Sequence, residues 1–281
     1  MTESSFNLPV ARKRQLKPSV FWSIRQGIPL WLKVVTPIVG LGIPILLWSI
    51  LSYGGIASAT FLPSPTAVLG AGWKMWTEGT LLPDILVSTA RVMAGFLAAA
   101  LIGVPIGIAM GTFHSMEGLF GPIVGTVRYM PINAFIPLII IWVGFAEDGK
   151  AIMILLGIVL YNAIMVADAV KFIPDELLNV AYTLGANRRE VLFKVILPAT
   201  LPSILDTLRV NIAGAWNFLI FAELLAAQNG LGFRIMQSQR YFNTDKALFC
   251  IVSIGMIGLL TDYVFKQLAI AATPWAEHSK V

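Results

Sequence analysis

Charged residues are scarce in this sequence. Asp, Glu, Lys and Arg make up 12% of its 281 residues, whereas about 25% of the residues of a soluble domain are charged. Hydrophobic residues make up 57% of the chain, and its mean hydropathy is +0.79. These values exclude a soluble globular protein and predict a polytopic membrane protein. The length allows about five or six membrane spans with short loops, and it excludes a large domain outside the membrane.

Cysteine and histidine are nearly absent. The single cysteine, Cys250, lies in an apolar run, so an internal disulfide framework and a C-x-x-C metal or redox site are excluded. We expect Cys250 to be buried as a small apolar side chain. The two histidines, His114 and His278, are too isolated to form a metal site. The sequence contains neither H-E-x-x-H nor G-x-S-x-G, so we predict no metal, no cofactor and no catalytic residue in this chain.

One phosphate-binding pattern is incomplete. Residues 144–150 match G-x-x-x-x-G-K, but Ala151 stands where a Ser or Thr should bind Mg²⁺, and an apolar span rather than a strand precedes the pattern. We therefore interpret the match as accidental. If the protein uses ATP, another chain must hydrolyse it.

Six segments are apolar enough to cross a membrane. The third is interrupted by Arg128 and two prolines, and the last two contain charged residues. Residues 60–83 include Trp73 and Trp76 and predict a turn and an amphipathic helix at the outer surface, which does not span. The six segments are 34–52, 92–113, 117–146, 151–167, 204–227 and 247–269.

The distribution of Lys and Arg predicts the orientation. Arg128 is left out of the count because it lies within a predicted span. Of the remaining Lys and Arg residues, thirteen lie in the N-terminal tail, in the central loop 171–203, at Arg209 or at the C-terminal end, and six lie on the opposite side. Cytoplasmic loops carry the excess of Lys and Arg, so we expect both termini and the central loop to be cytoplasmic. The net charge of +5 is for the same reason no evidence for a nucleic-acid partner.

Small residues recur at every fourth position of the second segment. Because positions four apart share one face of a helix, this stripe should allow another helix to approach closely. We interpret it as a dimer contact or a helix-packing contact. The alternative is a glycine-rich span that faces lipid. The stripe consists of Gly95, Ala99, Gly103, Gly107 and Gly111.

The central loop predicts two short helices that meet at a glycine. Pro174 suits the first turn of a helix, and the acidic residues Asp175 and Glu176 suit its positively polarised end. Gly185 suits a left-handed stop. Residues 188–196 form the second predicted helix, which Pro198 should end.

This loop resembles the cytoplasmic loop known as the EAA loop in the permease subunits of bacterial ABC importers. In these, A-x-x-x-G precedes an apolar, basic helix and L-P-x-x-x-P. Asn179 and Val180 depart from the pattern, in which Glu and Ala are usual. The alternative is an ordinary amphipathic loop of any polytopic protein. The matching residues are Ala181, Gly185, Leu197, Pro198 and Pro202.

Two further stretches resemble the nitrate, sulfonate and taurine branch of these permeases. Residues 128–150 are similar to its R-x-I-P…I-P-L…W-F-G-x-G-E-x-x-K run, and residues 222–232 to A-E-L…G-L-G. Within the branch, the chain looks most similar to the cyanobacterial nitrate and bicarbonate permeases. The resemblance implies an all-α type I ABC importer permease with the MetI-like fold, in a bacterial, cyanobacterial inner membrane.

The resemblance also implies partners and a division of the chain. The partners are a second copy of the chain, two ATPase subunits that bind ATP and Mg²⁺, a periplasmic or lipid-anchored solute-binding protein, and membrane lipid. The expected parts are a cytoplasmic tail with an interfacial segment (1–33), the first span with a periplasmic amphipathic segment (34–85), the core permease domain with its loop (86–270), and a C-terminal tail (271–281).

The motifs name two sets of candidate residues. In the family, the helix before the glycine binds a groove of the ATPase, so the expected coupling set is Asp175, Glu176, Leu178, Asn179, Ala181, Tyr182, Gly185, Ala186 and Pro198. A charge within the membrane should face a partner or an aqueous cavity. Arg128 is therefore expected either to line the substrate path, or to pair with a carboxylate such as Glu223 or cap the backbone carbonyls freed by Pro131. The expected path residues are Arg128, Met130, Pro131, Asn133, Asn211, Trp216, Asn217 and Glu223.

The function that we predict from the sequence is ATP-driven uptake of a small inorganic anion, either bicarbonate or nitrate. A sulfonate or taurine permease is the alternative within the same family. A stand-alone secondary transporter is a rival, but its inverted repeats are not visible, since residues 128–150 have no second copy. A third hypothesis is that the protein is a membrane anchor or an assembly factor.

Overall fold

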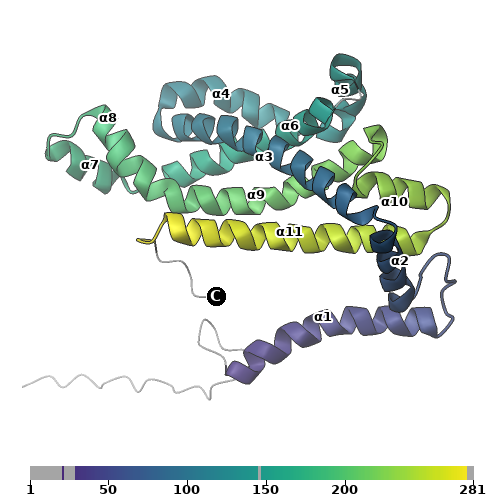
Figure 1. The fold of residues 1–281 in the computed structure, drawn as a ribbon. Helices are drawn as coiled ribbons and strands as arrows, with labels where there is room; N and C mark the ends of the chain where they lie inside the picture. The colour runs from purple at the N-terminus through teal and green to yellow at the C-terminus, as the bar shows by residue number, and fades with distance from the viewer. Residues whose placement is uncertain (1–20, 22–28, 145–146, 277–281) are drawn as a thin grey trace, which may run out of the picture. The chain divides into compact units, whose positions relative to one another are not determined.

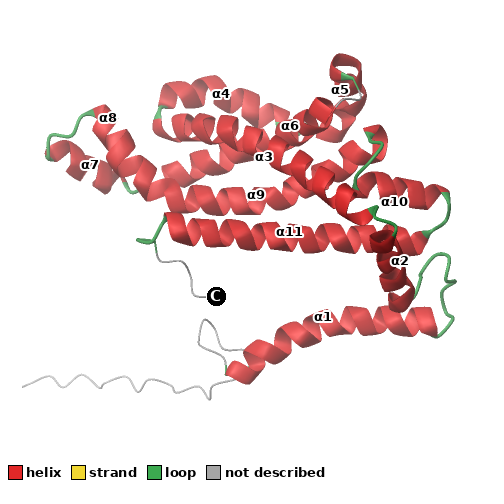
Figure 2. Cartoon of the chain, viewed as in Figure 1, coloured by secondary structure: helices red, strands yellow, loops and turns green. Residues whose placement is uncertain are grey.

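The computed structural model describes residue 21 and residues 29–144 and 147–276. Within this part of the chain every regular element is a helix, drawn in red in Figure 2. This confirms the predicted all-α fold class. Most of the expected basic tail and the end of the C-terminal tail lie outside the described residues. The backbone contacts divide the chain into two units, 1–57 and 58–281.

The first unit contains one long apolar helix, α1 (Leu30–Tyr53). Its 24 residues extend over about 36 Å, enough to cross a hydrocarbon core of about 30 Å. Pro37 and Pro44 lie inside the helix. The Thr36 hydroxyl donates to the Leu32 carbonyl at 2.8 Å, so this polar side chain is satisfied within its own helix. The helix confirms the predicted first span.

The second unit is a helical bundle, shown in Figure 1. Its longest helices are α3, α6, α9 and α11, and α9 runs beside α11. The elements of this unit are α2 (Pro65–Thr77), α3 (Leu81–Thr112), α4 (His114–Val127), η1 (Ile132–Phe135), α5 (Ile136–Val143), α6 (Glu147–Lys171), α7 (Asp175–Thr183), α8 (Arg188–Glu190), η2 (Val191–Ile196), α9 (Leu197–Ala226), α10 (Leu231–Arg240) and α11 (Thr244–Ala272).

The number of membrane spans agrees with the sequence. Among the described residues, five helical stretches are long and apolar enough to cross a membrane: α1, α3, α6, α11 and the stretch Arg188–Leu224. The helix pair 114–127 and 132–143 is bent by 83° and makes a sixth if it is one broken span. This bend lies where Arg128 and Pro131 predicted an interruption.

The glycine stripe of α3 packs against α6 of the same chain. A Cβ added at any of its four glycines would lie 2.6 or 2.7 Å from a backbone carbonyl oxygen of α6. Real Cβ atoms do not approach so closely, so only glycine permits this contact. The helix-packing prediction is therefore confirmed, whereas the dimer interpretation is wrong, because α6 already occupies the stripe. The glycines are Gly95, Gly103, Gly107 and Gly111.

Two predicted helix boundaries are wrong. Pro198 does not end a helix, because α8, η2 and α9 follow one another without a break. The π-helical turn η2 directly precedes Pro198, and such a wider turn gives room for a proline ring that would otherwise meet the carbonyl four residues earlier. Helix α3 begins at Leu81 rather than at residue 92. Its first turns contain Asp84, Ser88 and Arg91, which interrupt the apolar pattern but are buried.

Candidate functional site

Helix α7 begins and ends as its sequence requires. Pro174 is its N-cap residue and adopts an extended conformation, and two acidic residues lie in its first turn. At the other end, Gly185 has a φ of +86°. The Gly185 N–H donates to the Tyr182 carbonyl at 2.9 Å, and the Ala186 N–H donates to the Ala181 carbonyl at 3.1 Å. These two bonds form a Schellman motif, so the predicted glycine turn is confirmed.

The two faces of α7 have different surroundings. Leu178 and Ala181, together with Ala186, pack against a buried cluster of Val170, Val191 and Ile196. The adjacent face exposes Leu177 (44%), Val180 (57%) and Leu184 (82%). Three large apolar side chains are thus exposed on a short helix, and exposed apolar patches mark sites that contact another protein or a membrane. We call Leu177, Val180 and Leu184 the apolar face of α7.

The structure separates the expected coupling set into three groups. Asp175, Glu176, Asn179, Tyr182 and Gly185 are exposed and can meet a partner. Leu178, Ala181 and Ala186 are half-buried in the contact within the chain. Pro198 lies in the first turn of α9. The sequence motif did not identify the apolar face of α7. The spacing of its residues, three and four positions apart, was the signal that could have shown that they share one face of a helix.

A second capped turn connects α7 to the bundle. The Asn187 side chain accepts from the N–H groups of Arg189 at 3.0 Å and Glu190 at 3.1 Å. The Glu190 carboxylate accepts from the Asn187 N–H at 3.0 Å. This capping box starts a continuous helix through α8, η2 and α9. The turn after α7 therefore leads without a break into the stretch Arg188–Leu224, which is long and apolar enough to span a membrane.

A cavity of about 450 Å³ lies beside the base of α7. It is lined by the end of α3, the start of α4, the end of α6 and by Asp175 and Leu178 of α7. The Lys171 ammonium and the Glu117 carboxylate form an ion pair of 2.6 Å at this cavity. Both partners are largely exposed, so the pair adds little stability.

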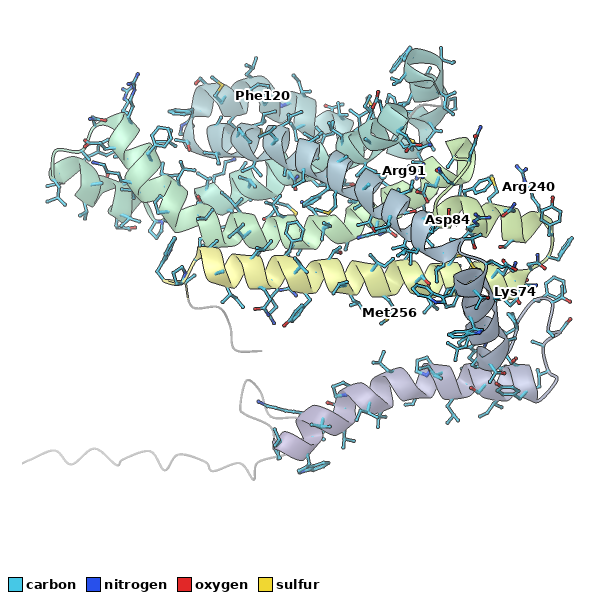
Figure 3. All side chains as sticks on the ribbon, viewed as in Figure 1. Lys74, Asp84, Arg91, Phe120, Arg240 and Met256 are labelled. Atoms are coloured by element: carbon cyan, nitrogen blue, oxygen red, sulfur yellow. The ribbon has the colours of Figure 1, made fainter. Side chains whose placement is uncertain are left out.

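A buried polar network lies at the other end of α9. Figure 3 labels Asp84 and Arg91, both on α3. All five N–H groups of Arg91 have acceptors. They donate twice to Glu147 of α6, to Glu223 of α9 at 2.6 Å, and to the carbonyl and side-chain oxygens of Asn229 at 2.9 and 2.5 Å. Because no donor is left, Arg91 cannot bind an anion without giving up one of these acceptors.

The same network holds the loop between α9 and α10. Glu223 is fully buried and accepts from Ser88 at 2.8 Å and from the Gly232 N–H at 2.8 Å. Asp84 accepts from the Gly230 N–H at 2.8 Å and from Arg234 at 2.5 Å. Gly230 has a φ of +107°, and a Cβ there would lie 2.4 Å from the Glu223 carboxylate. The A-E-L…G-L-G pattern is thus a carboxylate and the glycines that enclose it.

This network corrects the sequence-based role of Glu223. The expected path residue is buried in the network, and the alternative pairing of Arg128 with Glu223 is wrong. Lys150 of the incomplete phosphate pattern is buried as well and donates to Glu147 at 2.7 Å. The spacing of Asp84, Ser88 and Arg91, four and three residues apart, was the signal that could have revealed the site.

Removing Arg91 should destabilise the protein strongly. Arg91→Met leaves the Glu223 carboxylate buried without its charge partner, which costs about 3–5 kcal/mol. Arg91→Met with Glu223→Gln removes both charges and should recover part of this loss. We expect thermal unfolding in detergent to rank the double variant above the single one. Lys194→Met, which removes an exposed pair with Glu190 at 3.0 Å, is the control. A double variant less stable than Arg91→Met would contradict this role of the network.

Arg128 has a different environment. It is the C-cap residue of α4, at the bend of the interrupted span, and it is exposed. Its guanidinium donates to the Tyr129 hydroxyl at 2.8 Å and lies 4.7 Å from the centre of that ring. No carboxylate pairs with it among the residues that the structure describes. Arg128 therefore keeps donors free for an anion. Met130 and Pro131 are exposed beside it, and Asn133 lies in η1 with an unpaired side-chain oxygen.

The remaining path candidates do not gather with Arg128. Asn211 donates to Asn162 at 2.7 Å inside the contact between α6 and α9. Trp216 is buried and donates to Thr261 of α11 at 3.2 Å. Asn217 is exposed and donates to the Ala213 carbonyl of its own helix at 3.1 Å. Asn211, Trp216 and Glu223 thus face other helices of the chain, and of the candidates on α9 only Asn217 faces outward.

Comparisons with known proteins agree on one family. Residues 103–270 match the family model described as "Binding-protein-dependent transport system inner membrane component". The chain is 35% identical over 252 residues to the taurine transport system permease protein TauC of Escherichia coli, covering 88% of this chain and 92% of that protein. It is 32% identical over 231 residues to a putative aliphatic sulfonates transport permease protein, SsuC, of Bacillus subtilis, covering 82% and 84%.

A nitrate permease is a more distant relative. The nitrate import permease protein NrtB of Synechocystis is 27% identical over 251 residues, covering 86% of this chain and 90% of that protein. The expected similarity to cyanobacterial nitrate and bicarbonate permeases is therefore not confirmed. Among solved structures, an inward-facing conformation of the MetNI methionine ABC transporter matches with a TM-score of 0.62 at 19% identity, covering 68% of this chain and 95% of that chain. This likeness confirms the predicted MetI-like fold.

Proposed function

Since the chain belongs to the family of inner membrane components of binding-protein-dependent transport systems, and is a multi-pass permease of an ABC importer, we propose that it imports an organosulfonate such as taurine. The observation that favours this substrate class is the higher identity to taurine and sulfonate permeases than to a nitrate permease. This reverses the order of the two substrate classes that the sequence motifs had favoured.

The proposed mechanism couples α7 to the bundle. ATP and Mg²⁺ are bound by two separate ATPase subunits, and the apolar face of α7 docks on them. When the ATPases close, α7 moves with them, and the continuous helix of α8, η2 and α9 carries the movement across the membrane. The Arg91 network holds the far ends of α3, α6, α9 and α10 together, so that these helices move as one body. Import then follows by alternating access toward a solute-binding protein.

A second copy of the chain completes the proposed transporter. One face of α9 is exposed along the length of the span and includes Asp206, Val210, Ala213 and Asn217. Charged and amide side chains within a span rarely face lipid, because they meet no hydrogen-bonding partner there. This face therefore supports a two-fold partner or an aqueous path between two copies.

Uptake assays test the substrate class. A strain without its own sulfonate and nitrate importers would carry this permease with its cognate subunits as its only such system. We expect uptake of labelled taurine or an alkanesulfonate and no uptake of labelled nitrate or bicarbonate. Uptake of nitrate without any sulfonate would overturn the proposed substrate while leaving the ABC permease intact.

Arg128 is the proposed contact for the sulfonate. Its free donors lie at the bend of the interrupted span, and such a contact must bind weakly so that the anion can leave. Arg128→Lys keeps the charge but loses the planar fork, whereas Arg128→Gln loses both. We expect partial uptake with Lys and almost none with Gln, both variants being present in the membrane at normal levels. Normal uptake by Arg128→Gln would place the anion path elsewhere.

A further inference from the structure

Helix α2 has two apolar faces although it is too short to span a membrane. Its 13 residues extend over about 20 Å. Ser64 caps its first turn by accepting from the Ala67 N–H at 3.3 Å, and Pro65 follows at the first helical position. The helix is therefore a defined element rather than an irregular loop, and what covers each face can be considered separately.

The inward face of α2 is packed against the first turns of α11. The ring of Phe249 lies directly over Gly72, where an added Cβ would lie 2.0 Å from a ring carbon. Met75 belongs to the buried core of the bundle. The Thr244 hydroxyl, in the first turn of α11, donates to the Thr60 carbonyl at 2.5 Å. These contacts fix α2 at one end of α11.

The outward face of α2 consists of large apolar side chains. Leu69 is 68% exposed, Trp73 is 70% exposed and Trp76 is 55% exposed. Their spacing of four and three residues places them on one stripe of the helix. Lys74, labelled in Figure 3, lies beside the stripe, and its ammonium is 3.9 Å from the Glu78 carboxylate. Two tryptophans, a leucine and a lysine are the composition of a membrane-interface segment.

The position of α2 along α11 gives its depth in the membrane. The 29 residues of α11 extend over about 44 Å, which exceeds a hydrocarbon core of about 30 Å by roughly 7 Å at each end. Phe249 lies about 7 Å from the first residue of α11. The contact with α2 is therefore at the level where hydrocarbon gives way to headgroups. The exposed side chains of Ile251 and Val252 on α11 continue the apolar surface into the core.

We propose that the outward face of α2 binds the phospholipid surface. Leu69, Trp73 and Trp76 lie at the boundary between headgroups and acyl chains, where the indole rings bury apolar area and their N–H groups reach polar atoms. Lys74 lies beside a lipid phosphate. The helix thereby anchors one end of the bundle at a set depth.

Spin-label accessibility tests this assignment. Cys250 is buried and is the only cysteine of the chain, so Cys250→Ala provides a background for single-cysteine variants. Trp73→Cys is labelled with a nitroxide and the full chain is reconstituted in phospholipid nanodiscs. Leu184→Cys on the apolar face of α7 is the control outside the membrane, and Met256→Cys within α11 is the control inside it. The measured quantity is the ratio of collisions with oxygen to collisions with a water-soluble nickel chelate.

We expect the ratio at residue 73 to be several-fold higher than at residue 184 and lower than at residue 256. The same order is expected for Leu69→Cys, which guards against a local effect of losing one indole ring. A ratio equal to that at residue 184 would show a face open to water, as for a site that binds a soluble partner. Low accessibility to both reagents would show that protein covers the face, either a second copy or another part of this chain. Either result would overturn the proposal.

Discussion

Gly185→Val is expected to abolish uptake while the permease remains inserted in the membrane. Gly185 has a φ of +86° at the end of α7, a conformation in which a β-branched side chain is strongly strained. Nothing lies within 4 Å of its added Cβ, so the strain comes from the backbone alone. The Schellman turn should open and α7 should leave its position. We expect pull-down in detergent to show loss of the ATPase subunits.

Gly185→Asn is the matched control. Asparagine adopts the left-handed conformation more readily than other non-glycine residues, so this variant should retain most of the uptake. A second control changes the docking surface without changing the turn. Leu184→Glu places a charge on the apolar face of α7 and should weaken ATPase binding while α7 keeps its conformation. Full uptake by Gly185→Val would show that the turn plays no part in coupling.

Gly107→Leu is expected to prevent the bundle from folding. A Cβ at residue 107 would lie 2.6 Å from the Ala163 carbonyl oxygen and 2.7 Å from the Val166 side chain of α6. Helix α6 must therefore move away from α3 along the whole contact, because the backbone atom cannot rotate aside. Overpacking typically costs about 1–3 kcal/mol and more when backbone must shift. We expect almost no folded protein by fluorescence-detected size-exclusion chromatography.

Gly118→Leu is the matched control, because it makes the same substitution at a glycine that no other helix contacts. Nothing lies within 4 Å of a Cβ at residue 118 on α4, so this variant should accumulate at a normal level. The comparison also separates packing within the chain from assembly between chains. If Gly107→Leu yielded a folded monomer that failed only to dimerise, the stripe would be an interface after all, and the contact with α6 would be incorrect.

Much of the fold was predictable from short stretches of sequence. Long apolar runs predict spans, because an apolar helix satisfies its own backbone hydrogen bonds within a lipid core. Pro174 and Gly185 define the ends of α7 through their own backbone preferences. The interruption near Arg128 was predictable from the charge and the two prolines within an apolar run. The close approach of a helix to the glycine stripe was predictable from the spacing of the glycines. Each of these features depends on residues that are near one another in the chain.

Only the tertiary structure decided which residues contact each of these features. The glycine stripe indicates that a helix approaches closely, but not which helix, and the structure selects α6. Arg91 and Glu223 are 132 positions apart, and neither residue contains a local signal for the other. Their pairing reverses two predictions, the span boundary at residue 92 and the path role of Glu223. Burying a charge is costly unless a partner meets it, and only the folded chain brings that partner.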